Sequence, residues 1–195
     1  MTDLYDTPSD ATPLAPSERD GLLQSWITFR RDLNEAEQAN ITAGSAWALR
    51  QRRRDILTDD FVRLLHHKMF GGVWAWAGSY RKTECNIGIH PAHIALEVNV
   101  TLSDVKYWLE HGAYSTDEIA IRLHHRLVTI HPFANGNGRH TRLMADLLVV
   151  RQGNSPFTWG RDNLTEPGST RKQYIAALRA ADNHDIAPLL AFARS

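Results

Sequence analysis

The chain has 195 residues, of which 43% are hydrophobic, and its 22 Lys and Arg residues are balanced by 22 Asp and Glu residues. This length and apolar content are typical of one compact domain with a hydrophobic core. A formal charge of zero excludes the net field that would draw a protein to nucleic acid or to an anionic membrane. Cys85 is the only cysteine, which excludes an internal disulfide and favours a reducing compartment, the cytoplasm.

Residues 1–17 are rich in Pro, Ser and Thr and show no apolar periodicity, which predicts a flexible N-terminal arm. The arm is acidic and has no apolar core of the kind found in a secretion signal. No later segment offers the ~18 uninterrupted apolar residues of a membrane span. We therefore expect a cytoplasmic protein whose partners include neither a membrane nor nucleic acid.

Residues 18–54 read as an N-terminal helical extension, because their apolar side chains recur at helical spacing from Leu22 to Ile27 and again up to Leu49. Asn34 is a candidate N-cap for the second of these helices. The extension ends in an arginine run. We interpret this run as an exposed helix end rather than a nucleic-acid patch; it comprises Arg50, Arg52, Arg53 and Arg54.

The rest of the chain is dominated by helical spacing. Thr58 is expected to cap a helix that ends at Gly71. Further helices are predicted at 92–111, 116–130, 139–152, 168–181 and 184–193. Only the stretch SYRKTECNIGIHP alternates polar and apolar residues, which predicts a short β-hairpin. The sequence thus favours an all-α helical bundle with a small β-hairpin.

The most unusual stretch, HPFANGNGRHTR at residues 131–142, lies between two predicted helices. Gly136 and Gly138 permit a backbone that turns its amides inward and lets a ligand approach closely. Because the loop leads into a helix N-terminus, those amides are expected to cradle a di- or triphosphate. Arg139 and Arg142, three residues apart on the first helical turn, can both reach anionic oxygens.

His131 precedes this cradle, and an imidazole with an ordinary pKa of about 6.5 can accept a proton near neutral pH. A general base beside a phosphoanhydride suits transfer of a phosphorus group to a hydroxyl. Phe133 is expected to anchor the loop in the core. The alternative is a plain turn in which His131 caps a helix and the arginines are surface charges. The combination of these residue types within twelve positions favours the phosphate site.

These residues resemble the Fic family signature HxFx(D/E)GNGRxxR at every fixed position but one. WAGSYRKTECNIGIHP resembles the flap of that family, and RKQYIAALRAADNHDIAPLLAF resembles its C-terminal helices. The resemblance implies a Fic core domain at residues 55–195 with a Fic-type bundle and a β-hairpin flap. The segment LNEAEQANI is similar to one in the mobile mystery protein B group of the family.

The resemblance also implies an activity: transfer of AMP from ATP to a Ser, Thr or Tyr hydroxyl of a target protein, by the toxin-like half of a regulated pair. His131 would deprotonate the hydroxyl, and residues 136–138 would hold the α- and β-phosphates, with Asn137 positioning the α-phosphate. Arg139 would contact the outer phosphates and Arg142 the γ-phosphate.

The flap would bind an extended segment of the target by strand addition and present its hydroxyl. Because strand addition depends on backbone hydrogen bonds more than on side chains, it does not identify the target protein. The residues assigned to this docking flap are Thr83, Glu84, Cys85, Asn86, Ile87, Gly88 and Ile89.

Asn135 is the departure from the signature, since the family has Asp or Glu there to hold Mg²⁺. An amide oxygen binds Mg²⁺ without the charge that hard cations prefer, so Asn135 is a weak metal ligand. The alternative function is therefore a catalytically weakened nucleotide-binding or regulatory module. Trp74, Trp76 and Trp159 could stack adenine, although core packing is the favoured use of each.

An inhibitory helix with the pattern (S/T)xxxE(G/N) restrains many Fic proteins, and this chain contains no strict copy. Glu37 is the best substitute and Glu35 the second. The hypothesis is that Glu37 pairs with Arg142 in a resting state; the alternative is a solvated glutamate on a helix surface. Restraint by a separate antitoxin-like partner is a further alternative.

Overall fold

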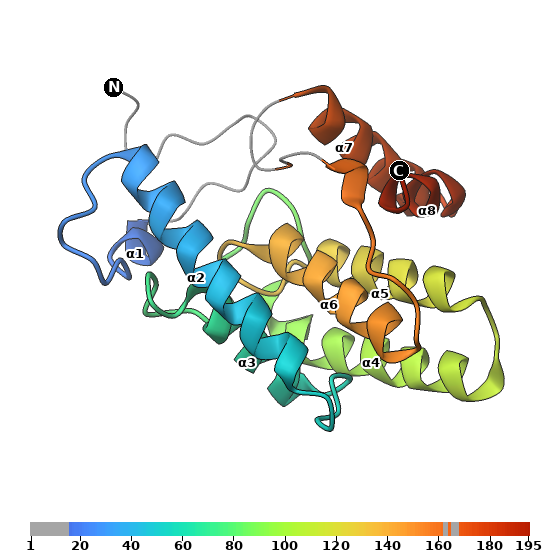
Figure 1. The fold of residues 1–195 in the computed structure, drawn as a ribbon. Helices are drawn as coiled ribbons and strands as arrows, with labels where there is room; N and C mark the ends of the chain where they lie inside the picture. Colours follow the sequence, from blue (N-terminus) through green and yellow to red (C-terminus); the bar gives the residue numbers. More distant parts are fainter. Residues whose placement is uncertain (1–15, 162–163, 165–167) are drawn as a thin grey trace.

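The computed structural model of the protein describes residues 16–161, 164 and 168–195 (Figure 1). Residues 1–15 of the predicted arm lie outside the described residues. The elements follow in the order α1 (Pro16–Arg19), α2 (Arg30–Arg50), α3 (Asp59–Phe70), the 3-10 turn η1 (Pro91–His93), α4 (Ile94–His111), α5 (Thr116–Ile130), α6 (Asn137–Arg151), the 3-10 turn η2 (Trp159–Arg161), α7 (Ser169–Asp182) and α8 (Ala187–Ala193). The predicted all-α class is confirmed for this part of the chain.

Helix α5 lies at the centre of the bundle, where it packs against α6 and α4 and also contacts α8. α2 packs along α3 and touches α6, and α7 packs against α8. The two pairs therefore flank the central helices from different sides (Figure 1). The loop from α5 to α6, which carries the predicted chemistry, lies where these groups of helices meet.

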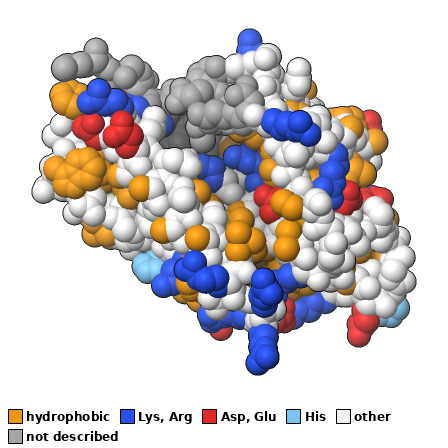
Figure 2. Space-filling model, in the orientation of Figure 1, with side chains coloured by type: hydrophobic (Ala, Val, Ile, Leu, Met, Phe, Trp, Pro, Cys, Tyr) orange, Lys and Arg blue, Asp and Glu red, His pale blue; other side chains and the backbone are white. Residues whose placement is uncertain are grey.

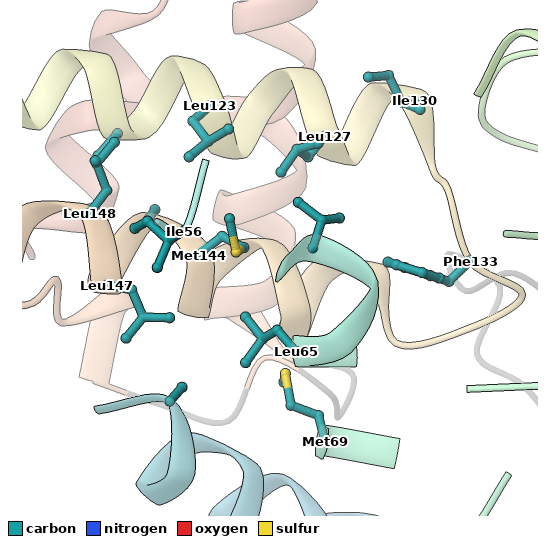
Figure 3. Packing of buried hydrophobic residues seen from close by; sticks show 14 of the residues in the cluster. Ile56, Leu65, Met69, Leu123, Leu127, Ile130, Phe133, Met144, Leu147 and Leu148 are labelled. Atoms are coloured by element: carbon teal, nitrogen blue, oxygen red, sulfur yellow. The ribbon is translucent and has the colours of Figure 1, made fainter. Parts of the chain in front are cut away.

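The centre of the core is formed by the apolar faces of α3, α5 and α6 (Figure 3), and α4, α7 and α8 add further buried side chains. Leu123 and Leu127 of α5 meet Met144 and Leu148 of α6, and all four side chains are at most 2% exposed. Full burial of such a side chain stabilises the fold by about 1.5–3 kcal/mol. Phe133, which lies in the α5–α6 loop itself, belongs to the same core and is fully buried. The loop is therefore anchored at its centre as well as at its ends.

Several predicted helix boundaries agree with the structure. The Thr58 hydroxyl accepts a hydrogen bond from the Phe61 amide (3.2 Å) and caps α3 as expected. α5 has the predicted bounds, and its cap is Ser115, whose hydroxyl accepts a bond from the Glu118 amide (3.3 Å). α6 starts two residues before its predicted position and α8 starts three residues after it.

The N-terminal extension differs from its prediction. Its long helix, α2, contains Asn34 in its interior, so this residue does not cap it. The residues just before α2 are not helical, because their backbone pairs with the chain that follows α3. The Leu23 amide donates to the Val73 carbonyl (2.9 Å), and Leu22 and Trp74 form an isolated antiparallel bridge. Nonlocal pairing thus overrides the helical spacing of this segment.

The predicted β-hairpin is wrong, because residues 83–89 contain no strand. The segment pairs with the end of α5 rather than with itself. The Arg81 amide donates to the Pro132 carbonyl (2.9 Å), and the Ile89 amide donates to the Ile130 carbonyl (3.3 Å). A hairpin would need such groups for cross-strand pairing. Their use by the α5–α6 connection leaves an irregular loop lying against that connection.

The face shown in Figure 2 carries no single dominant charge. Figure 2 shows one face, on which Lys and Arg side chains gather at several separate places with uncharged and hydrophobic atoms between them. The arginine run at the end of α2 is exposed, in agreement with its interpretation as a solvated helix end. Within the ranges that the structure describes, none of the helices combines the length and the apolar content needed to cross a bilayer.

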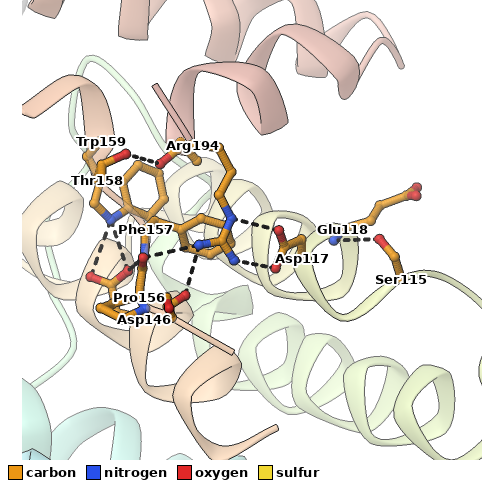
Figure 4. A network of polar contacts seen from close by, with 11 residues as sticks. Ser115, Asp117, Glu118, Asp146, Pro156, Phe157, Thr158, Trp159 and Arg194 are labelled. Atoms are coloured by element: carbon orange, nitrogen blue, oxygen red, sulfur yellow. Dashed lines mark hydrogen bonds and ion pairs between the residues drawn. The ribbon is translucent and has the colours of Figure 1, made fainter. Parts of the chain in front are cut away.

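Polar contacts fasten the C-terminal segment to the central helices (Figure 4). The Arg194 guanidinium, just after α8, binds the Asp117 carboxylate at the start of α5, with Nε 2.7 Å from Oδ2. Asp146 on α6 accepts hydrogen bonds from the Phe157 amide and from the Trp159 indole N–H, both at 3.1 Å. Burial raises the pKa of Asp146 to about 6, although these donors and nearby arginines lower it.

Candidate functional site

The candidate base, His131, lies where α5 ends. Its amide donates to the Leu127 carbonyl (3.1 Å), and its backbone is left-handed, with φ 53° and ψ 60°. Pro132 follows, and a proline disfavours a helical conformation in the residue before it. A left-handed backbone costs a residue with a side chain roughly 1–2 kcal/mol. The surrounding contacts must therefore hold His131 in place.

The His131 side chain is 8% exposed. Burial lowers its pKa to about 4, a hydrogen bond with the Val128 backbone opposes this change, and the Arg81 charge adds to it. The imidazole is therefore neutral at pH 7 and able to accept a proton. The sequence alone suggested an ordinary pKa for this residue, because it gives no sign of the burial.

The loop after His131 is closed by the Asn137 side chain. Its Oδ1 accepts a hydrogen bond from the Phe133 amide (2.9 Å), and its Nδ2 donates to the Phe133 carbonyl (2.8 Å). Asn137 is 2% exposed. The side chain that the resemblance assigned to the α-phosphate is thus engaged with the loop backbone, and it fixes the shape of the loop.

His66 of α3 also supports the α5–α6 loop, a role that was not predicted from the sequence. Its ring stacks on Phe133 with 3.7 Å between the ring centroids. Nδ1 accepts a hydrogen bond from the Gly78 amide (3.0 Å), so Nε2 carries the proton and donates to the Asn135 carbonyl (3.0 Å). Burial holds the His66 pKa well below its usual value, which keeps this bridging tautomer neutral. In the sequence His66 is only one more residue on an apolar helix.

Gly136 is the N-cap of α6 and has a left-handed backbone with φ 79°. A Cβ at this position would lie 2.5 Å from the ring of Phe70. Both the conformation and the close approach require glycine. Phe70, at the end of α3, therefore forms one wall of the loop.

The start of α6 presents backbone donors. The first helical hydrogen bond runs from the His140 amide to the Gly136 carbonyl (2.9 Å). The amides of residues 137–139 precede it and have no acceptor within the helix, so they form the positive end of the helix dipole. This is the local arrangement of an anion site at a helix N-terminus.

The two arginines of the motif do not converge. The Arg139 guanidinium turns toward α2, where Nη1 lies 2.6 Å from Oε2 of Glu37 and the group lies over the Phe70 ring at 4.9 Å. Arg142 turns toward α7, and its guanidinium lies 5.4 Å from the ring centroid of Tyr174. The two guanidinium groups therefore do not point toward one anion, as the sequence led us to expect.

Glu37 is buried, at 6% exposure, as a regulatory contact requires, but its predicted partner is wrong. It pairs with Arg139 instead of Arg142, and its Oε1 also accepts a hydrogen bond from the Trp74 indole (2.7 Å). The reason is geometric: α2 passes the first turn of α6, whereas Arg142 lies almost a full turn further along and faces α7. Glu35, the second candidate, is exposed and lies 3.9 Å from Arg31.

Arg142 forms no ion pair with a carboxylate among the residues that the structure places. Its position is set by Tyr174, which the sequence analysis did not single out. The Tyr174 hydroxyl and Nε2 of His124 form a buried hydrogen bond (3.0 Å). An Arg142 nitrogen would lie 3.5 Å from a Cβ placed on Gly138. The guanidinium thus lies next to the amides at the start of α6.

Asn135 does not fit a magnesium site held by the protein. Its Oδ1 accepts a hydrogen bond from the Gly136 amide (2.5 Å) and lies 3.5 Å from an Arg139 guanidinium nitrogen. A cation this close disfavours a metal ion at the same oxygen. The described part of the chain also contains no cluster of three or more His, Cys, Asp or Glu residues that could hold one.

The predicted docking segment, residues 83–89, borders His131. Gly88 has φ 104°, and a Cβ on it would lie 2.6 Å from Cβ of His131. The Thr83 hydroxyl donates to the Glu18 carboxylate (2.7 Å), and the Glu84 carboxylate lies 3.6 Å from His90. Ile87 is 45% exposed. One side of the segment is therefore packed against His131, and the other side, which carries Ile87, is exposed.

A concave feature of the described residues lies far from this loop. A wide depression of about 590 Å³ is lined by residues around Asp117, Gly153 and Arg194, at the start of α5. α5 has 15 residues and is therefore about 22 Å long, and His131 lies at its opposite end. None of the motif residues lines the depression.

The geometry defines the class of the domain: an all-α bundle with a glycine-capped helix start and a buried imidazole beside that loop. Residues 56–149 match the Fic/DOC family. The chain therefore carries a Fic/DOC family domain.

Two curated proteins illustrate the match in sequence. Protein adenylyltransferase fic-1 from Caenorhabditis elegans is 29% identical over 149 residues, which cover 74% of this chain and 28% of the relative. Protein adenylyltransferase Fic from Drosophila grimshawi is 30% identical over 145 residues, which cover 72% and 28%. This chain thus spans a little over a quarter of the length of these relatives.

Solved structures share the fold. The N-terminal Fic domain of a putative cell filamentation protein from Bartonella quintana, with bound ADP, has a TM-score of 0.68 at 16% identity, covering 91% of this chain and 94% of that one. BepC from Bartonella tribocorum, with bound AMPPNP, has a TM-score of 0.64 at 16% identity, covering 92% and 97%.

Replacing Gly136 with Ala tests whether the shape of the loop is set by the contact with Phe70. We expect Gly136→Ala to lose roughly 1–3 kcal/mol more unfolding free energy than Gly153→Ala. Gly153 is a matched control, since its φ is also positive at 87° but a Cβ there would meet no atom within 4 Å. Denaturant unfolding measures the difference. Equal losses in the two variants would contradict the close approach.

Proposed function

We propose that the chain is a Fic-type protein nucleotidyltransferase that moves AMP from ATP to a Ser, Thr or Tyr hydroxyl of a target protein. The observation that carries the proposal is the neutral imidazole of His131 beside a loop that opens α6 with amides that have no acceptor within the helix. The matched relatives are named protein adenylyltransferases, and two proteins of the same fold hold ADP and AMPPNP. These names support an adenine nucleotide as the substrate.

The proposed reaction is an in-line displacement at the α-phosphorus of ATP. The target oxygen forms a bond to this phosphorus while its proton passes to His131. The bond to the β-phosphate breaks, and pyrophosphate leaves with the electron pair. A neutral imidazole is required for the proton transfer, and the negative charge of bound ATP would raise the pKa of His131 and so help it to hold the proton.

The phosphates are assigned to the amides of residues 137–139 at the start of α6. Asn137 contributes its amide rather than its side chain, because the side chain already bonds to Phe133. Arg142 is assigned to the γ-phosphate, since it lies beside these amides without a carboxylate partner among the described residues. Arg139 contacts the outer phosphates once Glu37 releases it. Mg²⁺ arrives with ATP, as part of the substrate.

A nucleotide-binding module without turnover is the second candidate, and Asn135 is the observation that favours it. Its side-chain oxygen is engaged with the Gly136 amide, so it supplies no charge to a metal ion on the phosphates. The target and an antitoxin-like regulator are proposed as protein partners, with the target docking along residues 83–89. The LNEAEQANI segment, which lies in α2, supports placement in the mobile mystery protein B group.

The test of the proposed function compares His131→Ala with His125→Ala. His125 lies on the same helix but bonds to Asp182 (2.8 Å), outside the site. With α-³²P-ATP and a host lysate, or with the protein itself as acceptor, we expect His131→Ala to reduce labelling by at least about 100-fold and His125→Ala to leave it unchanged. The uncleavable analogue α,β-methylene-ATP should bind all three proteins alike by calorimetry. Binding without any labelling by the unmodified protein would favour the second candidate.

Glu37 is proposed to restrain the enzyme through Arg139. A guanidinium paired with a buried carboxylate cannot at the same time neutralise phosphate charge. The carboxylate is buried and has a second donor in Trp74, so the pair is held in a defined geometry although Arg139 is partly exposed. Release of Arg139 therefore requires α2 to move away or the carboxylate to be removed.

Removal of this carboxylate should activate the protein. We expect Glu37→Gly to raise ATP-dependent self-labelling roughly 5- to 150-fold, the usual range of coupling between two sites. Glu35→Gly is the matched control, because it places the same helix-weakening residue on an exposed part of α2. Labelling that rises equally in both variants would assign the effect to a weakened helix, and unchanged labelling would remove Glu37 from regulation.

A further inference from the structure

Arg81 is a buried cation that contacts both the docking segment, residues 83–89, and the backbone of the candidate base, His131. It is 5% exposed, and no carboxylate forms an ion pair with it in the described part of the chain. Its guanidinium donates instead to backbone carbonyls. Nε binds the carbonyl of His131 (2.6 Å), Nη1 binds that of Thr83 (2.8 Å) and Nη2 binds that of Ile89 (2.5 Å).

This geometry makes the guanidinium a bridge between two segments. The carbonyls of Thr83 and Ile89 lie at the two ends of the docking segment, whereas the carbonyl of His131 lies at the candidate base. A second contact of Nη2 reaches the Ile130 carbonyl at 3.4 Å. A buried charge is expensive unless its donors are satisfied, so the carbonyls must stay in place around it. One planar group therefore ties together both ends of the segment and the end of α5.

Gly88 supplies an independent close contact between the same two parts. A Cβ on Gly88 would lie 2.6 Å from Cβ of His131 and 2.7 Å from an Arg81 guanidinium nitrogen. Its φ of 104° is also a conformation that favours glycine. The segment can lie flat against His131 because this position has no side chain.

We propose that Arg81 is a positioning residue that fixes the docking segment 83–89 relative to the His131 backbone, so that a target hydroxyl is delivered to the imidazole. This role rests on the proposed function. Arg81 itself touches neither the phosphates nor the reacting hydroxyl. It holds His131 in its left-handed conformation and holds the segment that receives the target.

The test uses Arg81→Lys, which keeps the charge but loses the planar fork, and the control Lys82→Ala, which changes the exposed neighbour. Hydrogen exchange of the unliganded protein reads the Ile89 amide, which bonds to the Ile130 carbonyl. We expect Arg81→Lys to speed this exchange at least tenfold and to slow self-labelling from α-³²P-ATP at least tenfold, while the affinity for the uncleavable analogue α,β-methylene-ATP changes less than twofold. Lys82→Ala should change none of the three.

Exchange and labelling within twofold of the unmodified protein would overturn the proposal. If the unmodified protein shows no labelling, only the proposed function is contradicted. The exchange measurement then still decides whether Arg81 holds the docking segment in place. If Arg81→Lys does not fold, Gly88→Ala replaces it. The added methyl group pushes the segment away from His131 and should give the same faster exchange and slower labelling, with Gly112→Ala, which has φ 60° and open space, as its control.

Discussion

The two hydrogen bonds between the Asn137 side chain and the backbone of Phe133 set the shape of the loop on which the proposed chemistry depends. They close a short ring of backbone around a buried amide, and Phe133 fastens this ring to the core. His66 adds a third support through the Asn135 carbonyl. Because the polar groups inside the loop are satisfied by these partners, the amides at the start of α6 remain for a ligand. The site is thus organised before any nucleotide arrives.

The same loop is held from outside by two elements that are far away in sequence. From one side, α2 places Glu37 on Arg139, and from the other, α7 places Tyr174 under Arg142. The contact with Glu37 neutralises the positive charge of Arg139, whereas the contact with Tyr174 leaves the positive charge of Arg142 next to the start of α6. A buried ion pair contributes little net stability, but loss of one partner is costly. The Glu37–Arg139 contact is well suited to regulation, because Arg139 needs another anion as a partner when Glu37 leaves it.

The sequence predicted the elements whose signals are local. The helical spacing of α5 and the hydroxyl of Thr58 as a cap each reflect contacts within a few residues. The predicted hairpin and the predicted helix near Leu22 failed for the opposite reason, since their backbone groups pair with residues about 50 positions away.

The residues that support the site could not be predicted from the sequence either. His66 and Arg81 are ordinary in composition, and their roles appear only when the Asn135 and His131 carbonyls are brought to them by the fold. Likewise, Glu37 could be chosen from its place in the extension, but its partner depends on which turn of α6 faces α2. The burial that lowers the pKa of His131 to about 4 has no signature in the motif.

The central claim is that the braced loop between α5 and α6 receives a nucleoside triphosphate beside a neutral imidazole. The most direct measurement is a crystal structure of the protein with Mg²⁺ and α,β-methylene-ATP, whose α–β bond cannot be cleaved. The account predicts phosphate oxygens at hydrogen-bond distance, about 2.7–3.2 Å, from the amides of residues 137–139, with the α-phosphorus on the side of His131. Phosphates bound in the depression near Asp117 and Arg194, with the loop empty, would contradict it.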